Sequence, residues 1–284
     1  MSDVVEWIEQ SPYGRALGVS CEFVSDEAAR LELAFRETNS NPGGALHGGV
    51  AASLSLIGAQ AVARTALGPE TGPWHTVSMQ INYLAAAISE AVTAEVRLLR
   101  RGKELCFVEV KVRSEGERAI ADAILAVRGR CGAAPVDLLT SSGDGGEHDP
   151  GPMGERVGGV PFIGSRGIEV ELMRQGRSRL RMKWRPENGD LDGGTHEGAA
   201  LALLDTAGAM AAWAVTGPGR FKASTPSIQA QILGPPPAGD LVAYARVIQQ
   251  DNEIFWCDVE VAAAADQRIC ARGTVLYRIV TGSK

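Results

Sequence analysis

Residues 39–66 read NSNPGGALHGGVAASLSLIGAQAVARTA, and the rest of the chain can be arranged around this stretch. A loop rich in Gly, Pro and Asn ends at His47, Gly48 and Gly49, and a run of small apolar residues follows at once. Apolar residues lie nearly all round this run rather than along one stripe, which is typical of a helix buried inside a fold. The sequence therefore predicts a buried central helix over about residues 49–67.

A second copy of this stretch follows in the other half of the chain, where residues 188–214 read NGDLDGGTHEGAALALLDTAGAMAAWA. Identical residues recur 149 positions apart at Pro12 and Pro161, Gly18 and Gly167, His47 and His196, Thr76 and Thr225, and Gln80 and Gln229. A constant offset across several elements indicates a tandem repeat. We expect one unit over residues 1–131, a Gly/Pro/Asp-rich linker over 132–160, and a second unit over 161–284.

Alternating apolar residues predict the remaining elements of the first unit. They comprise a short helix at 3–9, a turn at 12–18, and strands at 19–24, 29–35, 76–84, 92–100, 105–114 and 118–127. Each half is thus an α+β unit, and its small-residue helix lets an antiparallel sheet wrap closely around it, which is the hotdog arrangement. Joining the two sheets edge to edge would also protect their exposed edges, so the predicted fold is a double hotdog.

The motif N-P-G-G-A-L-H-G-G before an Ala-rich helix resembles the PaaI-type hotdog acyl-CoA thioesterases. The resemblance covers both halves, about residues 12–127 and 161–280. It implies an acidic residue nine positions after the histidine, an Asn or Gln six positions before it, and a hydroxyl residue on the following strand. The first half supplies Asn41, His47 and Gly48, and the second half supplies Asp205 and Thr225.

Helix geometry indicates how these residues could combine. Nine residues place Asp205 about half a turn round from His196 and ~13 Å along the axis, so Asp205 cannot meet its own histidine loop. It can meet the loop of a neighbouring antiparallel helix, and the resemblance implies such an interface site. We therefore predict one composite active site, formed by Asn41, His47, Gly48, Asp205 and Thr225. The opposite set contains Asp190, His196, Glu197 and Leu56, and we expect it to lack a catalytic acid, with Glu197 acting only as a first-turn charge.

The expected reaction is hydrolysis of an acyl-CoA thioester to a carboxylic acid and free CoA. The Gly48 N–H and Asn41 would stabilise the oxyanion, and Asp205 would act either as general base or as nucleophile. Thr225 would orient the water or the carboxylate, whereas His47 either shapes the loop or takes part directly. Arg100, Arg101 and Lys103 flank a hairpin turn and either bind the CoA phosphates or form an ordinary solvated turn.

Composition excludes several other classes of function. A net charge of −6 argues against a nucleic-acid surface and a polybasic membrane anchor. The longest apolar run, residues 48–63, is shorter than a membrane span, and the acidic amphipathic N-terminus is unlike a signal peptide. The five cysteines form no CxxC pair, which is typical of reduced thiols, so we expect a cytoplasmic protein. Metal and nucleotide motifs are missing as well, so we expect no metal and no cofactor beyond the CoA of the substrate.

Two other functions stay open at the level of sequence. A hotdog hydratase or dehydratase acting on acyl-CoA would share this fold, and a non-catalytic acyl-CoA binding protein would fit the asymmetry of the two sets. The sequence does not specify the acyl group. We expect the chain to act as an internal dimer, and association of two chains into a homodimer is a further expectation.

Overall fold

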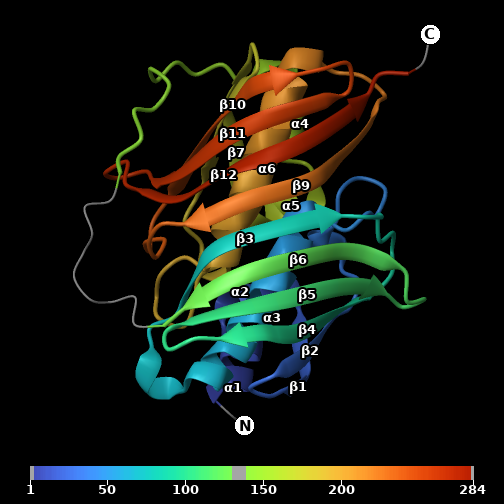
Figure 1. Cartoon of the computed structure of the whole chain (residues 1–284). Helices are drawn as coiled ribbons and strands as arrows, with labels where there is room; N and C mark the ends of the chain where they lie inside the picture. Colours follow the sequence, from blue (N-terminus) through green and yellow to red (C-terminus); the bar gives the residue numbers. More distant parts are fainter. Residues whose placement is uncertain (1–2, 130–138, 283–284) are drawn as a thin grey trace.

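The computed structural model describes residues 3–129 and 139–282 (Figure 1). The helices of the first half are α1 (Asp3–Gln10), α2 (Pro12–Leu17) and α3 (Gly48–Leu67), with 3-10 turns η1 (Glu37–Asn39) and η2 (Pro69–Thr71). Its strands are β1 (Val19–Val24), β2 (Ala28–Leu33), β3 (His75–Tyr83), β4 (Val92–Arg101), β5 (Leu105–Ser114) and β6 (Ala119–Arg128). The predicted central helix and all six predicted strands of this half are present, with ends that differ by two residues at most.

The second half repeats this order. Its helices are α4 (Gly151–Val157), α5 (Pro161–Arg166) and α6 (Glu197–Thr216), with the 3-10 turn η3 (Pro186–Asn188). Its strands are β7 (Ile168–Arg174), β8 (Arg177–Met182), β9 (Lys222–Ile232), β10 (Leu241–Gln250), β11 (Ile254–Ala263) and β12 (Ile269–Val280). The central helices α3 and α6 begin 149 positions apart, which is the offset seen in the sequence.

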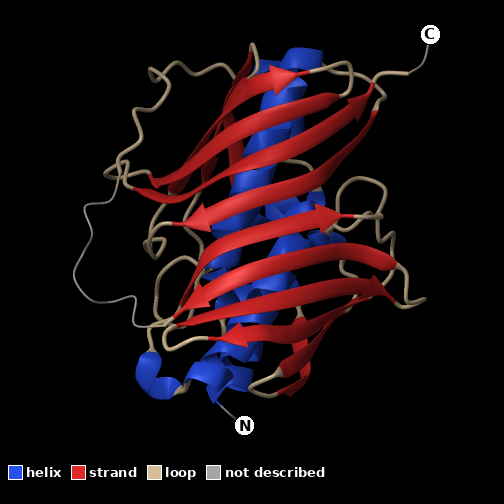
Figure 2. Ribbon diagram, viewed as in Figure 1, coloured by secondary structure: helices blue, strands red, loops and turns tan. Residues whose placement is uncertain are grey.

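All these strands form one 12-stranded antiparallel sheet, in the order β1-β2-β4-β5-β6-β3-β9-β12-β11-β10-β8-β7. The two halves join where β3 pairs with β9, and Gln80 lies directly opposite Gln229. Because these two glutamines are equivalent residues, a pseudo-twofold axis passes between them. Figure 2 shows both central helices on one side of this sheet, so the fold is a double hotdog.

The helices α3 and α6 run antiparallel and overlap at their first turns. A Cβ on Gly49 would come within 2.7 Å of the Ala202 backbone. At the equivalent contact the Ser53 hydroxyl donates a 3.0 Å hydrogen bond to the Gly198 carbonyl. Such close approach requires small residues, which explains why both helices are rich in Ala, Gly and Ser. The contact brings the N-terminus of each helix beside the second turn of the other.

Both central helices begin at a histidine. The Nδ1 atoms of His47 and His196 accept 3.0 Å hydrogen bonds from the N–H groups of Gly49 and Gly198, respectively. These bonds satisfy first-turn donors that would otherwise stay unpaired. The repeated histidines are therefore N-caps in both halves.

The structure corrects two expectations about local structure. Residues 12–17 form the short helix α2 rather than a turn, because Ser11 caps the Gly14 N–H at 3.2 Å and Pro12 occupies the first helical position. The segment expected to be a linker carries α4, which packs on β7. Residues 130–138 of the expected linker, including Cys131, lie outside the described residues.

The two central helices are long and apolar enough to cross a membrane, but they are buried inside the fold. Each has 20 residues. The argument that the apolar run is shorter than a membrane span therefore fails, because it counted only residues 48–63. Inside the fold, 89% of the apolar window of α3 and 83% of that of α6 are buried. Sheet and neighbouring helix thus surround both helices, as their all-round apolar pattern predicts.

Candidate active site

Asp205 lies on α6 and faces the start of α3 from the other half of the chain. A Cβ placed on Gly48 would come within 2.7 Å of Asp205 Oδ2. The carboxylate is 3.7 Å from His47 Nδ1, and only 3% of the residue is exposed. The antiparallel overlap of the two helices creates this contact. The structure therefore brings Asp205 beside His47 and Gly48, as the spacing predicts.

Thr225 fixes the Asp205 carboxylate. Thr225 Oγ1 on β9 donates a 2.8 Å bond to Oδ1. Burial nevertheless raises the pKa of Asp205 to about 6, and the bond from Thr225 and the nearby Gly49 N–H oppose that rise only in part. A carboxylate with a pKa close to neutral is suited to exchange a proton during a reaction.

His47 is held as a neutral capping group. Its Nδ1 accepts the 3.0 Å bond from Gly49, so in this arrangement the proton of the neutral ring resides on Nε2. Burial lowers the pKa of His47 to about 3, and the ring packs on Phe162 with centroids 4.4 Å apart. The 3.7 Å approach to Asp205 is therefore not an ion pair at neutral pH. The geometry supports the loop-shaping alternative for this histidine.

Gly48 occupies the first position of α3, with its N–H at the positive end of the helix. Its carbonyl accepts a 2.8 Å hydrogen bond from the Tyr83 hydroxyl on β3, which fixes the peptide unit that follows. Asn41 lies in the preceding loop, and its backbone N–H bonds to the Ala45 carbonyl at 2.8 Å. Within the described residues no hydrogen bond joins the Asn41 side chain to Asp205. The structure thus places Asn41 in the loop beside the site without giving its amide a partner there.

The basic hairpin does not share this site. Arg101 on β4 pairs with Cys106 on β5, Cys106 pairs with Val127 on β6, and Val127 pairs with Thr76 on β3. Arg101 and Thr76 therefore lie at the same level of the sheet. The β3–β9 register places Thr225 opposite residue 84, which is about 26 Å along β3 from Thr76 at ~3.3 Å per residue. Arg100, Arg101 and Lys103 therefore lie at the opposite end of the sheet from Thr225. Binding of CoA phosphates by these residues stays a prediction, beside the alternative of an ordinary solvated turn.

The second composite set, which was expected to lack a catalytic acid, holds a buried carboxylate at Glu197. Glu197 reaches across the interface, where its Oε2 accepts bonds from the Thr76 N–H at 3.0 Å and from Gln60 Nε2 at 2.7 Å. Burial raises the pKa of Glu197 to about 7, although Thr76 and Arg64 both lower it. Glu197 is thus a buried group that contacts the other half of the chain, and not a simple first-turn charge.

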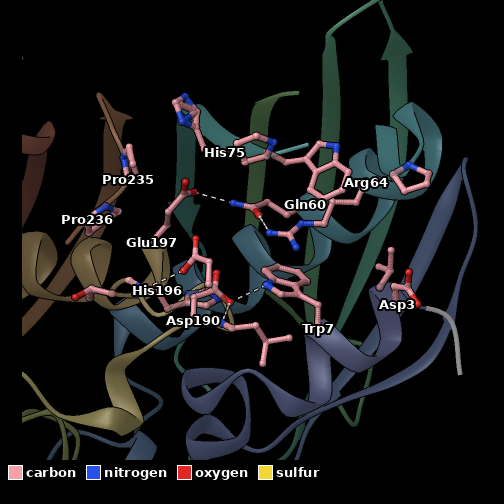
Figure 3. Close-up of a pocket in the computed structure, with 18 of the residues that line it drawn as sticks. Asp3, Trp7, Gln60, Arg64, His75, Asp190, His196, Glu197, Pro235 and Pro236 are labelled. Atoms are coloured by element: carbon pink, nitrogen blue, oxygen red, sulfur yellow. Dashed lines mark hydrogen bonds between the residues drawn. The ribbon is translucent and has the colours of Figure 1, made fainter. Parts of the chain in front are cut away.

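A cavity of about 960 Å³ opens beside Glu197 (Figure 3). Gln60 links Glu197 to Arg64, whose Nη2 donates a 2.8 Å bond to Gln60 Oε1. The Arg64 guanidinium lies 3.6 Å from the centre of the Trp7 ring and 5.1 Å from that of Trp74. These residues come from α1, α3 and the start of α6, with Trp74 just before β3. Sequence reasoning named Glu197 but missed Gln60, Arg64 and the two tryptophans.

Asp190 lines the same cavity and has a structural partner. Its Oδ1 accepts hydrogen bonds from Trp7 Nε1 at 2.8 Å and from the Leu191 N–H at 2.7 Å. The carboxylate therefore fixes the position of the Trp7 ring against the loop that precedes α6. A buried Leu56 side chain completes this half of the interface, at the position equivalent to Asp205.

Comparisons with known proteins agree with this architecture. Residues 35–129 match the acyl-CoA thioesterase N-terminal domain family. A “putative esterase” of Halobacterium salinarum is 33% identical over 110 residues, which are 37% of this chain and 72% of that protein. A second “putative esterase”, from Saccharolobus solfataricus, is 30% identical over 125 residues, which are 44% of this chain and 81% of that protein.

Solved structures share the fold over nearly the whole chain. The structure of a “putative thioesterase” from Novosphingobium aromaticivorans has a TM-score of 0.68 and 17% identity, covering 91% of this chain and 97% of its own. A protein with the hot dog fold from Alicyclobacillus acidocaldarius, of unknown function, has a TM-score of 0.66 and 17% identity, covering 95% and 98%. With the sequence relatives and the fold taken together, the chain belongs to the hotdog-fold thioesterase family.

Proposed function

We propose that this hydrolase is an acyl-CoA thioesterase, with a composite active site formed by α3 of one half and α6 of the other. The observation that carries the proposal is the Asp205 carboxylate, which Thr225 holds at 2.8 Å against the N-terminus of α3. A helix N-terminus offers unpaired N–H groups and a positive dipole, whereas the carboxylate offers a base or a nucleophile. The two together match the needs of acyl transfer to water.

The reaction can be derived from this arrangement. The thioester carbonyl oxygen would lie at the Gly48 N–H, where the developing negative charge is stabilised by ~3 kcal/mol per well-placed donor. Asp205 would take a proton from water as the water oxygen attacks the carbonyl carbon, and the C–S bond then breaks as the proton passes to the leaving thiolate to give free CoA. Alternatively, Asp205 would attack that carbon itself and displace the thiolate, and water would then hydrolyse the resulting mixed anhydride to the carboxylic acid, with its second proton going to the thiolate. Thr225 positions the carboxylate throughout, and His47 maintains the loop.

A thiol-release assay tests this proposal. Purified protein is assayed with short, medium, long and aromatic acyl-CoA substrates, with enoyl absorbance followed in parallel to detect hydration or dehydration. We expect thiol release that falls by about 10²-fold or more in Asp205→Asn for the substrates used at this site. Asp26→Asn, on an exposed residue, serves as the matched control. Thiol release by Asp205→Asn equal to the wild-type rate on every substrate would overturn the assignment of this site.

A further inference from the structure

Each of the two composite sites holds a buried carboxylate, but at a different position of the repeat. At the first site a side chain on Gly48 would collide with Asp205 Oδ2, since its Cβ would lie 2.7 Å away. The position of a side chain at residue 48 therefore overlaps that of a carboxylate at residue 205. At the second site the equivalents are Glu197 and Leu56, so the acid is carried by the helix start and the second position is apolar. Both acids lie on α6, Glu197 at its first position and Asp205 within the helix, and both are buried.

Equivalent threonines hold the two carboxylates. Thr225 on β9 bonds to Asp205, and Thr76, its equivalent on β3, bonds to Glu197 through its N–H. Gln60 adds a 2.7 Å bond to Glu197 Oε2, the oxygen that also accepts from Thr76. Oε1 accepts neither of these two bonds. The other half of the chain thus fixes Glu197 through Oε2, and these bonds do not occupy Oε1.

The space for a ligand lies at this second site. The cavity of about 960 Å³ is at the upper end of the range for pockets that enclose a drug-sized molecule. Trp7, Trp74 and four prolines supply much of its wall. At the first site, by contrast, Trp213 replaces Arg64 in the repeat and stacks on Phe221 with centroids 6.1 Å apart. The two sites therefore offer their ligands different surroundings.

Charge indicates which acyl groups the cavity would accept. Asp3, Asp190, Asp192 and Glu197 all line it, against the single cation Arg64. That cation already bonds to Gln60 and stacks on two tryptophans. A second carboxylate on the acyl group would meet like charges in a partly desolvated space, which is unfavourable. An uncharged alkyl or aryl group would instead pack on the tryptophans and prolines.

We propose that this cavity is a second thioester-hydrolysis site, in which Glu197 activates water for attack on thioesters of bulky, uncharged acyl groups. The thioester substrate class rests on the function proposed above. Glu197 takes a proton from water, the water oxygen bonds to the carbonyl carbon, and the C–S bond breaks. The proton then passes to the thiolate, so the products are a carboxylic acid and a free thiol. The basic hairpin at Arg101 is level with Thr76 across the sheet, at the same end as the residue that bonds to Glu197.

Four proteins distinguish the two sites: wild type, Asp205→Asn, Glu197→Gln and the double variant. Each is assayed for thiol release with hexanoyl-CoA, benzoyl-CoA and glutaryl-CoA, and circular dichroism verifies folding. We expect Asp205→Asn to keep hydrolysis of the two uncharged substrates, at least tenfold above its rate with glutaryl-CoA. The double variant should fall to the spontaneous rate. Glu32→Gln, on an exposed residue of β2, is the matched control.

The possible outcomes separate the two proposals. Equal rates for Asp205→Asn and the folded double variant would overturn the second site while leaving the first intact. Loss of hydrolysis in Glu197→Gln alone would support the second site and overturn the assignment of the first. If wild type releases no thiol from any of the acyl-CoA substrates, both proposals fail together. A preference of Asp205→Asn for glutaryl-CoA would overturn the proposed selectivity.

Discussion

Gly48 and Asp205 occupy neighbouring space so closely that a single methyl group on residue 48 would lie 2.7 Å from Asp205 Oδ2. Residue 48 must therefore lack a side chain if residue 205 is to carry a carboxylate here. At the second site the equivalent positions, 197 and 56, carry the acid Glu197 and the apolar Leu56. Several expected outcomes follow from this relationship.

Gly48→Ala should impair the site at Asp205. The new Cβ must push the carboxylate away from Thr225 or shift α3 against α6, and overpacking of this kind commonly costs about 1–3 kcal/mol. We expect a loss of at least tenfold in the Asp205-dependent rate, measured by thiol release, together with a lower free energy of unfolding. Gly116→Ala is the control, because a Cβ there meets nothing within 4 Å. A Gly48→Ala protein with the activity and stability of wild type would contradict the close contact.

The two acids should give different pH profiles. Each must lose its proton to act as a base, so activity rises with pH through the pKa of the acid in use. Burial raises the pKa of Asp205 to about 6 and that of Glu197 to about 7. In Glu197→Gln, kcat/KM should therefore rise with a midpoint near pH 6, and in Asp205→Asn with a midpoint near pH 7. If kcat/KM rises over the same pH range in both variants, the same group controls both rates.

Glu197 should also make the fold less stable as pH rises. Its pKa is raised from 4.5 to about 7, so between these values the folded chain keeps a proton that the unfolded chain has released. The stability contributed by this group is thus fully present below pH 4.5 and is lost as pH rises through 7, by about 3 kcal/mol. Glu197→Gln removes the effect while keeping the shape of the side chain.

Denaturant unfolding at pH 5 and pH 8 measures this difference. We expect the free energy of unfolding of Glu197→Gln, relative to wild type, to be higher at pH 8 than at pH 5. Glu32→Gln should follow wild type at both pH values, since Glu32 is exposed. Parallel profiles for wild type and Glu197→Gln would mean that the folded chain does not raise the pKa of Glu197.

The repeat, the central helices and the strands were predictable because they depend on local periodicity and a constant offset. The meeting of Asp205 with His47 and Gly48 was predictable because the family resemblance indicates an acid nine positions after the histidine, and helix geometry places that acid away from its own histidine loop. The role of Glu197 was not, since a glutamate in a first helical turn is favourable without any tertiary contact. Its long side chain and the tertiary partners Thr76 and Gln60 decide its position, and no sequence pattern near Glu197 indicates them.

A pair of substitutions at the second site tests whether residues 56 and 197 affect each other's contribution to stability. Leu56→Asp alone introduces a second carboxylate beside Glu197 in a fully buried position, and we expect it to lower the free energy of unfolding by about 3–5 kcal/mol. Glu197→Gly alone removes the bonds to Thr76 and Gln60 and adds a flexible residue to the helix. Together the two changes recreate the Gly48 and Asp205 arrangement, with Thr76 in the place of Thr225.

The double variant Leu56→Asp/Glu197→Gly should therefore be more stable than the sum of the single effects predicts. In the double variant the new Asp side chain can occupy the space that Glu197 vacates and accept a bond from Thr76, which neither single variant allows. Urea unfolding of the four proteins gives the coupling free energy, and we expect at least about 1 kcal/mol in favour of the double variant. The distant pair Leu56→Asp/Glu32→Gln should be additive. Additivity in the double variant as well would show that positions 56 and 197 do not compete for one space, and the equivalence of the two carboxylates would fail with it.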